Sequence, residues 1–295
     1  MGVVDTILTA IADFNQGVTE ITNGLPQSYC VLNTADSDTT MVSNSGALVS
    51  VIELGGSIIM VGSDRYNDII NTIADSLKPF MEEQAHQLQV VFDYDPSQAR
   101  VAVKESLSPS FTTADLLHLD LKGFLSDWTD SVSSYCSKER CYLVLWTLPD
   151  ALTESSKKKD RKSMQKSFKN SIQGDSIQNA AWTPTSLHEV HNSYLSSVQT
   201  ALSDLELIYK VLDNHETLHG IRSMMYPSLT GQHWRASLPG DPIPVSAPEP
   251  LSKKGDQAIF GYPEIGEQLF PDAVEDDGSL IIIDDRHHAP LLMTL

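Results

Sequence analysis

The sequence has few cysteines, no positive charge near its start and no long apolar run. Its three cysteines are Cys30, Cys136 and Cys141, an odd and sparse set that fits a reducing cytosol better than a disulfide framework. The longest apolar stretches, such as residues 142–146, are strand-sized and fall far short of the roughly 20 residues that span a bilayer. Because the first basic residue is Arg65, we expect no signal peptide and a cytoplasmic chain.

Positive charge is scarce overall and is gathered in one place. The 295 residues include 20 basic and 39 acidic side chains, a formal net charge of −19, yet residues 157–169 hold seven basic side chains and one acidic side chain. An acidic surface repels phosphate, so we expect no direct nucleic-acid partner. The basic segment is open to three interpretations: a solvated loop, a contact with an acidic protein, or a contact with an anionic membrane surface. Its basic side chains are Lys157, Lys158, Lys159, Arg161, Lys162, Lys166 and Lys169.

The order of expected elements predicts an α/β fold of α+β character. A mixed β-sheet with an N-terminal hairpin is expected to pack against helices, followed by a C-terminal helical segment and a Pro-rich linker. Apolar residues recur every three or four positions in residues 1–25, which indicates an amphipathic helix. After a polar, loop-like segment over 33–45, the hairpin is expected from a strand over 47–54, a turn at Gly55-Gly56 and a strand over 57–61.

Helices and strands are expected to alternate further along the chain. The patterns predict a helix over 64–86, a strand over 87–94, helical residues over 97–136 with a break near Pro109, a strand over 141–148 and one long helix over 186–223. The expected domain order is the N-terminal helix over 1–25, a docking and assembly domain over 28–235 with a basic loop at 153–175, a Pro-rich linker over 236–278, and a final segment over 279–295.

The sharpest local motif spans His215 to His219 and reads His-Glu-Thr-Leu-His. In zinc hydrolases two histidines one helical turn apart bind the metal, and the glutamate between them, here Glu216, activates a water molecule. A structural interpretation is favoured, in which both histidines end the apolar face of a long helix, because short motifs of this kind often occur by chance. The candidate third zinc ligands lie in or beyond the Pro-rich linker and are Asp241, Glu249 and Glu264.

A phosphate-binding loop is absent from this sequence. The chain has no Gly-Lys dipeptide, and it contains neither a G-x-x-x-x-G-K-[ST] nor a G-x-G-x-x-G motif. We therefore assign no catalytic residue, no cofactor-binding residue and no cofactor to these 295 residues. Only the zinc-hydrolase alternative gives His215, Glu216 and His219 a metal-binding or catalytic role.

One stretch near the start carries a family resemblance. Residues 40–56, which read TMVSNSGALVSVIELGG, resemble the opening hairpin of the large cytoplasmic ATPases of type IV secretion and conjugation systems. The expected helix over 66–80 and the strands over 86–92 and 140–147 follow in the order of that family, and residues 281–291 look like the lead-in to its motor domain. Within the family the chain is most similar to the type IVB branch, which includes the DotO/IcmB and TraU proteins.

The resemblance implies a non-catalytic N-terminal domain that serves docking and assembly. The whole protein would be a cytoplasmic ATPase, peripheral to the inner membrane, that energises export of effector proteins or conjugative transfer. Because the nucleotide-binding motifs of the family are missing here, we expect a truncated chain, with ATP and Mg²⁺ bound by a further C-terminal domain. The implied partners are inner-membrane components of the secretion system and other copies of the full-length protein.

Overall fold

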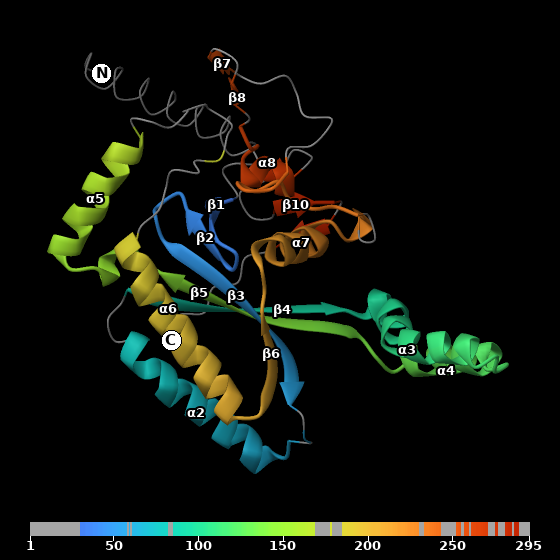
Figure 1. The fold of residues 1–295 in the computed structure, drawn as a ribbon. Helices are drawn as coiled ribbons and strands as arrows, with labels where there is room; N and C mark the ends of the chain where they lie inside the picture. Colours follow the sequence, from blue (N-terminus) through green and yellow to red (C-terminus); the bar gives the residue numbers. More distant parts are fainter. Residues whose placement is uncertain are drawn as a thin grey trace, which may run out of the picture.

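The computed structural model arranges its described residues around one six-stranded sheet (Figure 1). It describes residues 30–57, 59, 61–81, 85–168, 178, 185–229, 233–242, 252–254, 257–259, 261–270, 275–276, 281–284 and 286–288. The expected N-terminal helix over 1–25 and the basic residue Lys169 lie outside the described residues. More than half of the expected Pro-rich linker over 236–278 is described, and there Leu238 and Ile265 are buried in one core cluster with Leu218 of the preceding domain.

The main sheet has the strand order β1-β2-β3-β5-β4, and β6 pairs with the outer half of β3. Its strands are β1 (Leu32–Ser37), β2 (Thr40–Ser43), β3 (Leu48–Ser57), β4 (His86–Asp95), β5 (Lys138–Thr147) and β6 (Leu207–Val211). The structure confirms the expected α/β class of sheet and helices. The sheet was expected to mix parallel and antiparallel strands, but every pairing between these described strands is antiparallel.

Helices cover the main sheet, and two small sheets accompany the later part of the chain. The helices are α2 (Ser63–Met81), α3 (Ala99–Leu116), α4 (Lys122–Ser133), α5 (Glu154–Phe168), α6 (Thr185–Asp204), α7 (Asn214–Met225) and α8 (Ile265–Leu269), with 3-10 turns at Pro96–Gln98, Pro149–Ala151 and Pro227–Leu229. The small sheets contain β7 (Ser252–Lys254) with β8 (Gln257–Ile259), and β10 (Ile281–Ile283) between β9 (Glu275–Asp276) and β11 (Arg286–His288). None of the described helices is both long and apolar enough to cross a membrane.

Successive side chains of β3 point to opposite faces of the sheet, and a core lies on each face. Ile52 packs with Leu77 of α2 and Tyr194 of α6 on one face. Val51 packs with Leu212 on the other face, where α7 lies. Figure 1 shows α2 and α6 side by side beneath the sheet and α7 with α8 above it. The period-two pattern of β3 therefore serves two cores, as expected for a strand with both faces covered.

The expected turn at Gly55-Gly56 is wrong, because both glycines lie inside β3. The pairing of β3 with β6 shifts register between Leu54 and Gly56, and Gly56 has a positive φ of 96°, so the pair marks an irregularity in the strand. The expected loop over 33–45 is also wrong, because it contains β1 and β2. Hairpin turns instead lie between these strands and at residues 44–46, where Gly46 has a φ of 83°.

The expected long helix over 186–223 is three elements, α6, β6 and α7. Glu206 has a positive φ of 57° just after α6, which turns the chain back onto the sheet. Asp213 then caps the start of α7 through its side chain. The short strand escaped the sequence pattern because Ile208 and Leu212 stand four residues apart, a spacing that also fits a helix.

The expected break near Pro109 is displaced, because α3 runs through this proline and ends after Leu116. His118 has a positive φ of 54°, and its N–H donates to the carbonyl of Asp115. The N–H of Leu119 donates to the carbonyl of Ala114, which completes a Schellman-type end. The termination signal is thus a local hydrogen-bond motif with histidine in the position that glycine usually occupies.

Candidate interaction surfaces

The outer half of the β4–β5 ribbon and the helices α3 and α4 at its tip project from the sheet, and we call residues 90–141 the arm (Figure 1). The ribbon keeps one unbroken register from His86 opposite Thr147 to Asp95 opposite Lys138. Helices α3 and α4 pack against each other at its end. The arm therefore extends the sheet beyond the helices that cover it elsewhere. We call all described residues outside the arm the body.

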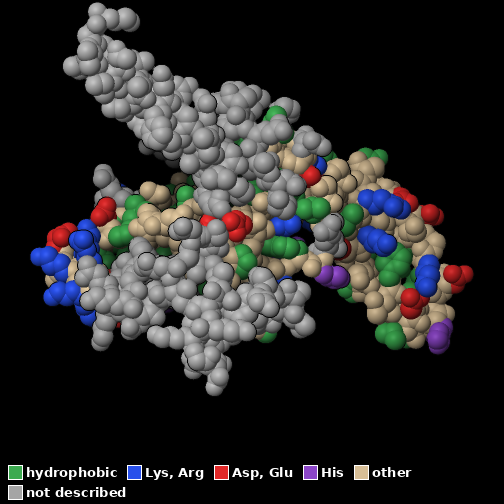
Figure 2. All heavy atoms as spheres, turned by 90° about the horizontal axis from the view of Figure 1, so that it is seen from above, with side chains coloured by type: hydrophobic (Ala, Val, Ile, Leu, Met, Phe, Trp, Pro, Cys, Tyr) green, Lys and Arg blue, Asp and Glu red, His purple; other side chains and the backbone are tan. Residues whose placement is uncertain are grey.

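Large apolar side chains are exposed mainly on the arm. Of the 17 such side chains among the described residues, 11 belong to the arm. They are Val90, Phe92, Tyr94, Val101, Leu116, Leu117, Leu119, Leu121, Phe124, Trp128 and Tyr135. Figure 2 shows hydrophobic side chains spread over this projecting part on the right of the view. Exposed apolar groups concentrated in this way make the arm a candidate surface for contact with another molecule.

The exposure of the ribbon results from where the covering helices end. His86 lies in the body, where its ring contacts Phe80 of α2 and Tyr194 of α6 with centroid distances of 5.5 and 4.6 Å. Phe92 follows on the same face of β4 six residues later and is 61% exposed. The same strand face is thus part of the core in the body and a bare apolar surface in the arm.

Ion pairs hold the arm together, and a hydrogen bond joins it to the body. Arg100 of α3 lies 2.6 Å from Asp130 of α4. At the base, Arg140 of β5 lies 2.6 Å from Asp93 of β4 and also donates to the hydroxyl of Ser223 in α7 at 3.1 Å. Because the Arg140 and Asp93 side chains are half-buried, this pair is screened by water less than an exposed pair.

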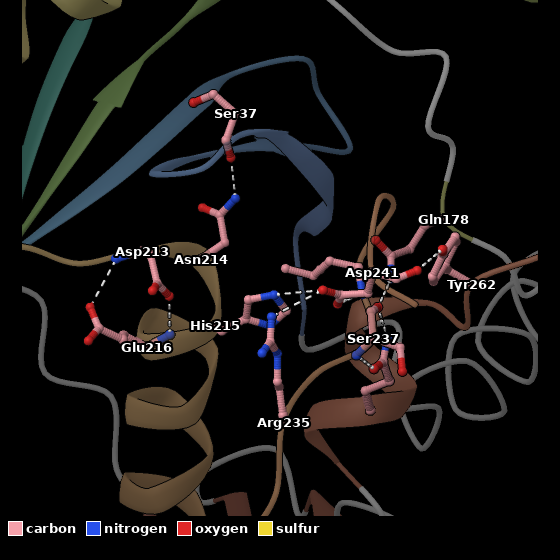
Figure 3. A network of polar contacts seen from close by, with 12 residues as sticks. Ser37, Gln178, Asp213, Asn214, His215, Glu216, Arg235, Ser237, Asp241 and Tyr262 are labelled. Carbon is pink, nitrogen blue, oxygen red and sulfur yellow. Dashed lines mark hydrogen bonds and ion pairs between the residues drawn. The ribbon is translucent and has the colours of Figure 1, made fainter. Parts of the chain in front are cut away.

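The motif residues His215, Glu216 and His219 all belong to α7, but Glu216 is turned to the start of its own helix (Figure 3). The N–H of Glu216 donates to the carboxylate of Asp213 at 2.7 Å, and the N–H of Asp213 donates to the carboxylate of Glu216 at 3.2 Å. Lys210 forms an ion pair with the same Glu216 carboxylate. This arrangement is a capping box, which stabilises the helix N-terminus.

The two histidines have different surroundings. The Nε2 atom of His215 lies 3.2 Å from a carboxylate oxygen of Asp241, which also pairs with Arg235 at 3.1 Å (Figure 3). His219 is exposed on the next turn of the helix. Among the described residues there is no group of three or more His, Cys, Asp or Glu side chains arranged to hold a metal ion. The zinc-hydrolase hypothesis thus stays a prediction with two of its three motif residues in structural contacts.

An open hollow of about 500 Å³ lies beside the motif and is lined by charged and apolar side chains. The side chains that line it with the motif include Glu53, Lys138, Arg140, Lys210 and Arg235. A second cavity, of about 370 Å³, lies between the sheet and α7 and is mainly apolar, with Val51, Val144 and Met224 in its walls.

The basic segment forms α5, so the expected loop over 153–175 is wrong for the residues of this helix. Lys157 is engaged by Asp150 at 3.0 Å and by Glu154 at 3.3 Å. The buried carboxylate of Asp160 accepts hydrogen bonds from the N–H and hydroxyl of Ser186, which fixes α5 to the start of α6.

The outward side chains of α5 form a basic surface. Lys158, Lys159, Arg161 and Lys162 are exposed and form no ion pair with another described residue. Basic side chains at this end of the molecule are visible on the left of Figure 2. The side chain of Lys166 and all of Lys169 lie outside the described part of the chain. Six of the seven candidate contact residues therefore belong to one helix, and four of them are exposed without an ion pair to a described residue.

No protein-family model matches this chain, and no curated protein matches it either.

The apolar arm was missed by sequence reasoning although its residues are conspicuous. Alternation in residues 86–95 and an apolar cluster at 116–124 both indicate burial when they are taken alone. The one available signal was the density of leucine and aromatic residues around the turn at 117–121, where turns are usually polar.

Proposed function

We propose that this chain is a docking and assembly domain that acts through protein contacts and has no catalytic activity of its own. The observation that carries the proposal is the arm, which holds 11 of the 17 exposed large apolar side chains of the described residues. A domain that presents interfaces needs a rigid core and an exposed apolar surface, and it needs no catalytic group. The capping role of Glu216 is consistent with this proposal.

The biological setting we propose is the one that the family resemblance implies. The chain would belong to a cytoplasmic ATPase of a type IV secretion system, of the IVB branch, and would dock this ATPase on inner-membrane components. ATP and Mg²⁺ would bind elsewhere in the full-length protein, and hydrolysis would energise export of effector proteins or conjugative transfer. In this setting the arm is the apolar contact with the membrane complex.

The basic surface of α5 supports a second, weaker contact. Its four exposed cations lie on a body that is otherwise acidic, so they are suited to an anionic membrane surface. Each basic residue near such a surface contributes on the order of 1 kcal/mol, so four of them hold a domain only loosely. We therefore propose that the arm makes the main contact and that α5 only steers and orients the protein, which would be peripheral to the inner membrane.

Docking is tested with matched double variants on two helices. Phe124→Ala with Trp128→Ala removes an i, i+4 apolar pair from α4, where the two rings lie 5.9 Å apart. Tyr66→Ala with Ile70→Ala removes a similarly exposed i, i+4 pair from α2 in the body. Because aromatic side chains dominate interface energies, we expect the α4 variant to weaken binding to purified inner-membrane components at least about tenfold. The α2 variant should bind as the parent chain does, and equal binding by both variants would contradict the proposal.

The role of α5 is tested by flotation with vesicles of phosphatidylglycerol and phosphatidylethanolamine. Reversing Lys158, Lys159, Arg161 and Lys162 to Glu should abolish flotation at low salt. Raising the ionic strength should abolish flotation of the parent chain as well, since exposed charges are screened. If neither higher ionic strength nor charge reversal reduced flotation, α5 would not be the part of the chain that contacts the vesicles.

The absence of catalysis is tested on the purified chain. We expect no ATP turnover above that of a mock preparation, and no stoichiometric zinc by elemental analysis. One tightly bound zinc ion that is lost in His219→Ala would instead support the zinc-hydrolase alternative.

A further inference from the structure

The strand β4 forms a free edge of the main sheet. Among the described strands it pairs with β5 only, and that pairing runs over all ten residues without a register shift. Residues 86–92 contain no Lys, Arg, Asp, Glu or Pro, and the two charged residues of the strand, Asp93 and Asp95, lie at its outer end. Native sheets usually protect a free edge with charged residues or Pro, with a bulge or with a covering element. Over residues 86–92 the strand β4 has no such residue and no bulge, and no described strand pairs with its outer side.

The opposite edge of the same sheet is protected. The strand β1 has six residues, and its pairing with β2 shifts register twice, between Leu32 and Thr34 and between Ala35 and Ser37. Such irregularities twist an edge away from a new partner. The remaining edge strand, β6, contains Lys210, a residue type that protects free edges. The contrast with β1 and β6 indicates that β4 serves pairing, whereas the other two edges resist it.

We propose that β4 pairs with β4 of a second copy of this chain, antiparallel about a two-fold axis that passes through Val91. The pairing extends the sheet across two copies and closes on itself, so it produces a dimer and not a filament. The inference rests on the proposed assembly role and names the surface used for self-association. The two arms then project in opposite directions, which leaves α3 and α4 available for the docking contact.

The side chains of β4 are self-complementary in this register. Val90, which is 60% exposed, lies opposite Phe92 of the second copy, so apolar groups meet on the bare face. Gln89 lies opposite Asp93 of the second copy, and Gln87 lies opposite Asp95 of the second copy. No acidic side chain faces another, which avoids the repulsion between like charges directly opposite each other.

Neighbouring arrangements fit less well. A shift of the two-fold axis to Phe92 would place apolar Val91 opposite Asp93 of the second copy. A parallel pairing in register would place Asp93 beside Asp93, although each carboxylate is partly neutralised by Arg140 of its own chain at 2.6 Å. Charge and apolar pattern therefore select the antiparallel register centred on Val91.

The expected dimer is weak because the contact is small. Stable protein interfaces bury roughly 1,200–2,000 Å² in total, and one strand pair with a few apolar side chains falls below this range. We therefore expect a reversible dimer whose population depends on protein concentration. Further contacts in the full-length protein would strengthen it.

Sedimentation velocity of the purified 295-residue chain over a series of concentrations tests the pairing. The parent chain should show a concentration-dependent shift from monomer to dimer. Val90→Lys should weaken the dimer at least about tenfold, because it removes the apolar contact with Phe92 of the second copy and places on the edge strand a lysine, a residue type that protects free edges. Ile70→Lys is the matched control, since Ile70 is 47% exposed on α2 in the body, and it should dimerise as the parent does.

Hydrogen exchange locates the contact and does not depend on any variant. The amides of residues 86–95 should become more protected as protein concentration rises, while those of β1 stay unchanged. The inference would be overturned if the dimer persisted in Val90→Lys. It would also be overturned if the hydrogen-exchange protection of residues 86–95 did not change with protein concentration. The docking proposal is tested separately, because Phe124→Ala with Trp128→Ala should lose docking and keep the dimer.

Discussion

The body and the arm share two strands, and they differ in what covers those strands. In the body, Leu88 packs against the core that α2 and α6 build on one face of the sheet. In the arm, Phe92 and Tyr94 continue the same face of the same strand and are 61% and 58% exposed. The strand is chemically similar along its length, so the difference lies in where two helices end. Apolar side chains therefore stabilise the fold in one region and are available to partners in the other.

The largest expected effect contrasts one residue from each region. Leu145→Ala removes a fully buried side chain from the core between the sheet and α6, and should reduce the free energy of unfolding by about 3–5 kcal/mol. Phe124→Ala removes a larger side chain from the arm, where it is 64% exposed, and should change stability by less than about 1 kcal/mol. Urea denaturation of both variants measures the difference. Equal destabilisation would mean that the arm is part of the cooperative core.

A second prediction concerns pH and is specific to the body. His191 of α6 is fully buried between the hydroxyl groups of Thr147, at 2.8 Å, and Ser50, at 2.9 Å. Burial, assisted by the nearby His188 and His86, lowers the pKa of His191 from 6.5 to about 4. The folded protein therefore holds this imidazole neutral at pH values where the unfolded chain has already taken up a proton.

The sign of the effect follows from the pKa in the two states. Above pH 6.5 the stabilisation is complete, and it is lost as pH falls toward 4, because the unfolded state then binds more protons than the folded state. We expect a loss of about 3 kcal/mol from this residue between pH 7 and pH 4. The pH dependence of unfolding should become shallower in His191→Gln than in the parent chain. If the unfolding free energy of His191→Gln and of the parent chain changed with pH to the same extent, His191 would not be the source of the effect.

The smallest expected effect tests the motif of α7. Asp213→Ala removes the side chain that accepts from the N–H of Glu216 at 2.7 Å, and should cost about 1 kcal/mol of unfolding free energy. Glu216→Ala should have a similar effect and should change no binding to docking partners. Thermal unfolding with a matched exposed variant, His219→Ala, provides the comparison. An unchanged stability for both cap variants would reopen a chemical role for Glu216.

The elements that follow one clear period were predictable. The strand β4 lies within one residue of its expected range at each end, and α2 begins one residue before its expected start but ends at Met81, five residues before its expected end. The long helix over 186–223 was wrong because Ile208 satisfies both periods, and pairing with β3 decides between them. The turn at Gly55-Gly56 was wrong because glycine also permits an irregularity within a strand, where Gly55 approaches the side chain of Ile208.

The candidate surfaces were predictable to different degrees. The basic side chains were evident from charge alone, since a cluster of like charges favours solvent wherever it lies. Their helix was not evident, because the anchoring pair of Asp160 and Ser186 joins residues 26 positions apart. The motif His215 to His219 was visible, but its function as a cap depends on Asp213 having an extended backbone, with ψ at 168°, where a continuous helix was expected.

By itself the sequence determined an acidic chain with an isolated basic segment, no phosphate-binding loop, and alternating helix and strand patterns of an α/β fold. These properties depend on composition and on neighbours within a few residues. Only the tertiary structure decided that residues 90–141 stand beyond the covering helices, and that β4 is a free edge while β1 is an irregular one. Exposure and strand order depend on contacts between distant segments, and a local pattern of apolar residues is the same whether or not another element covers it.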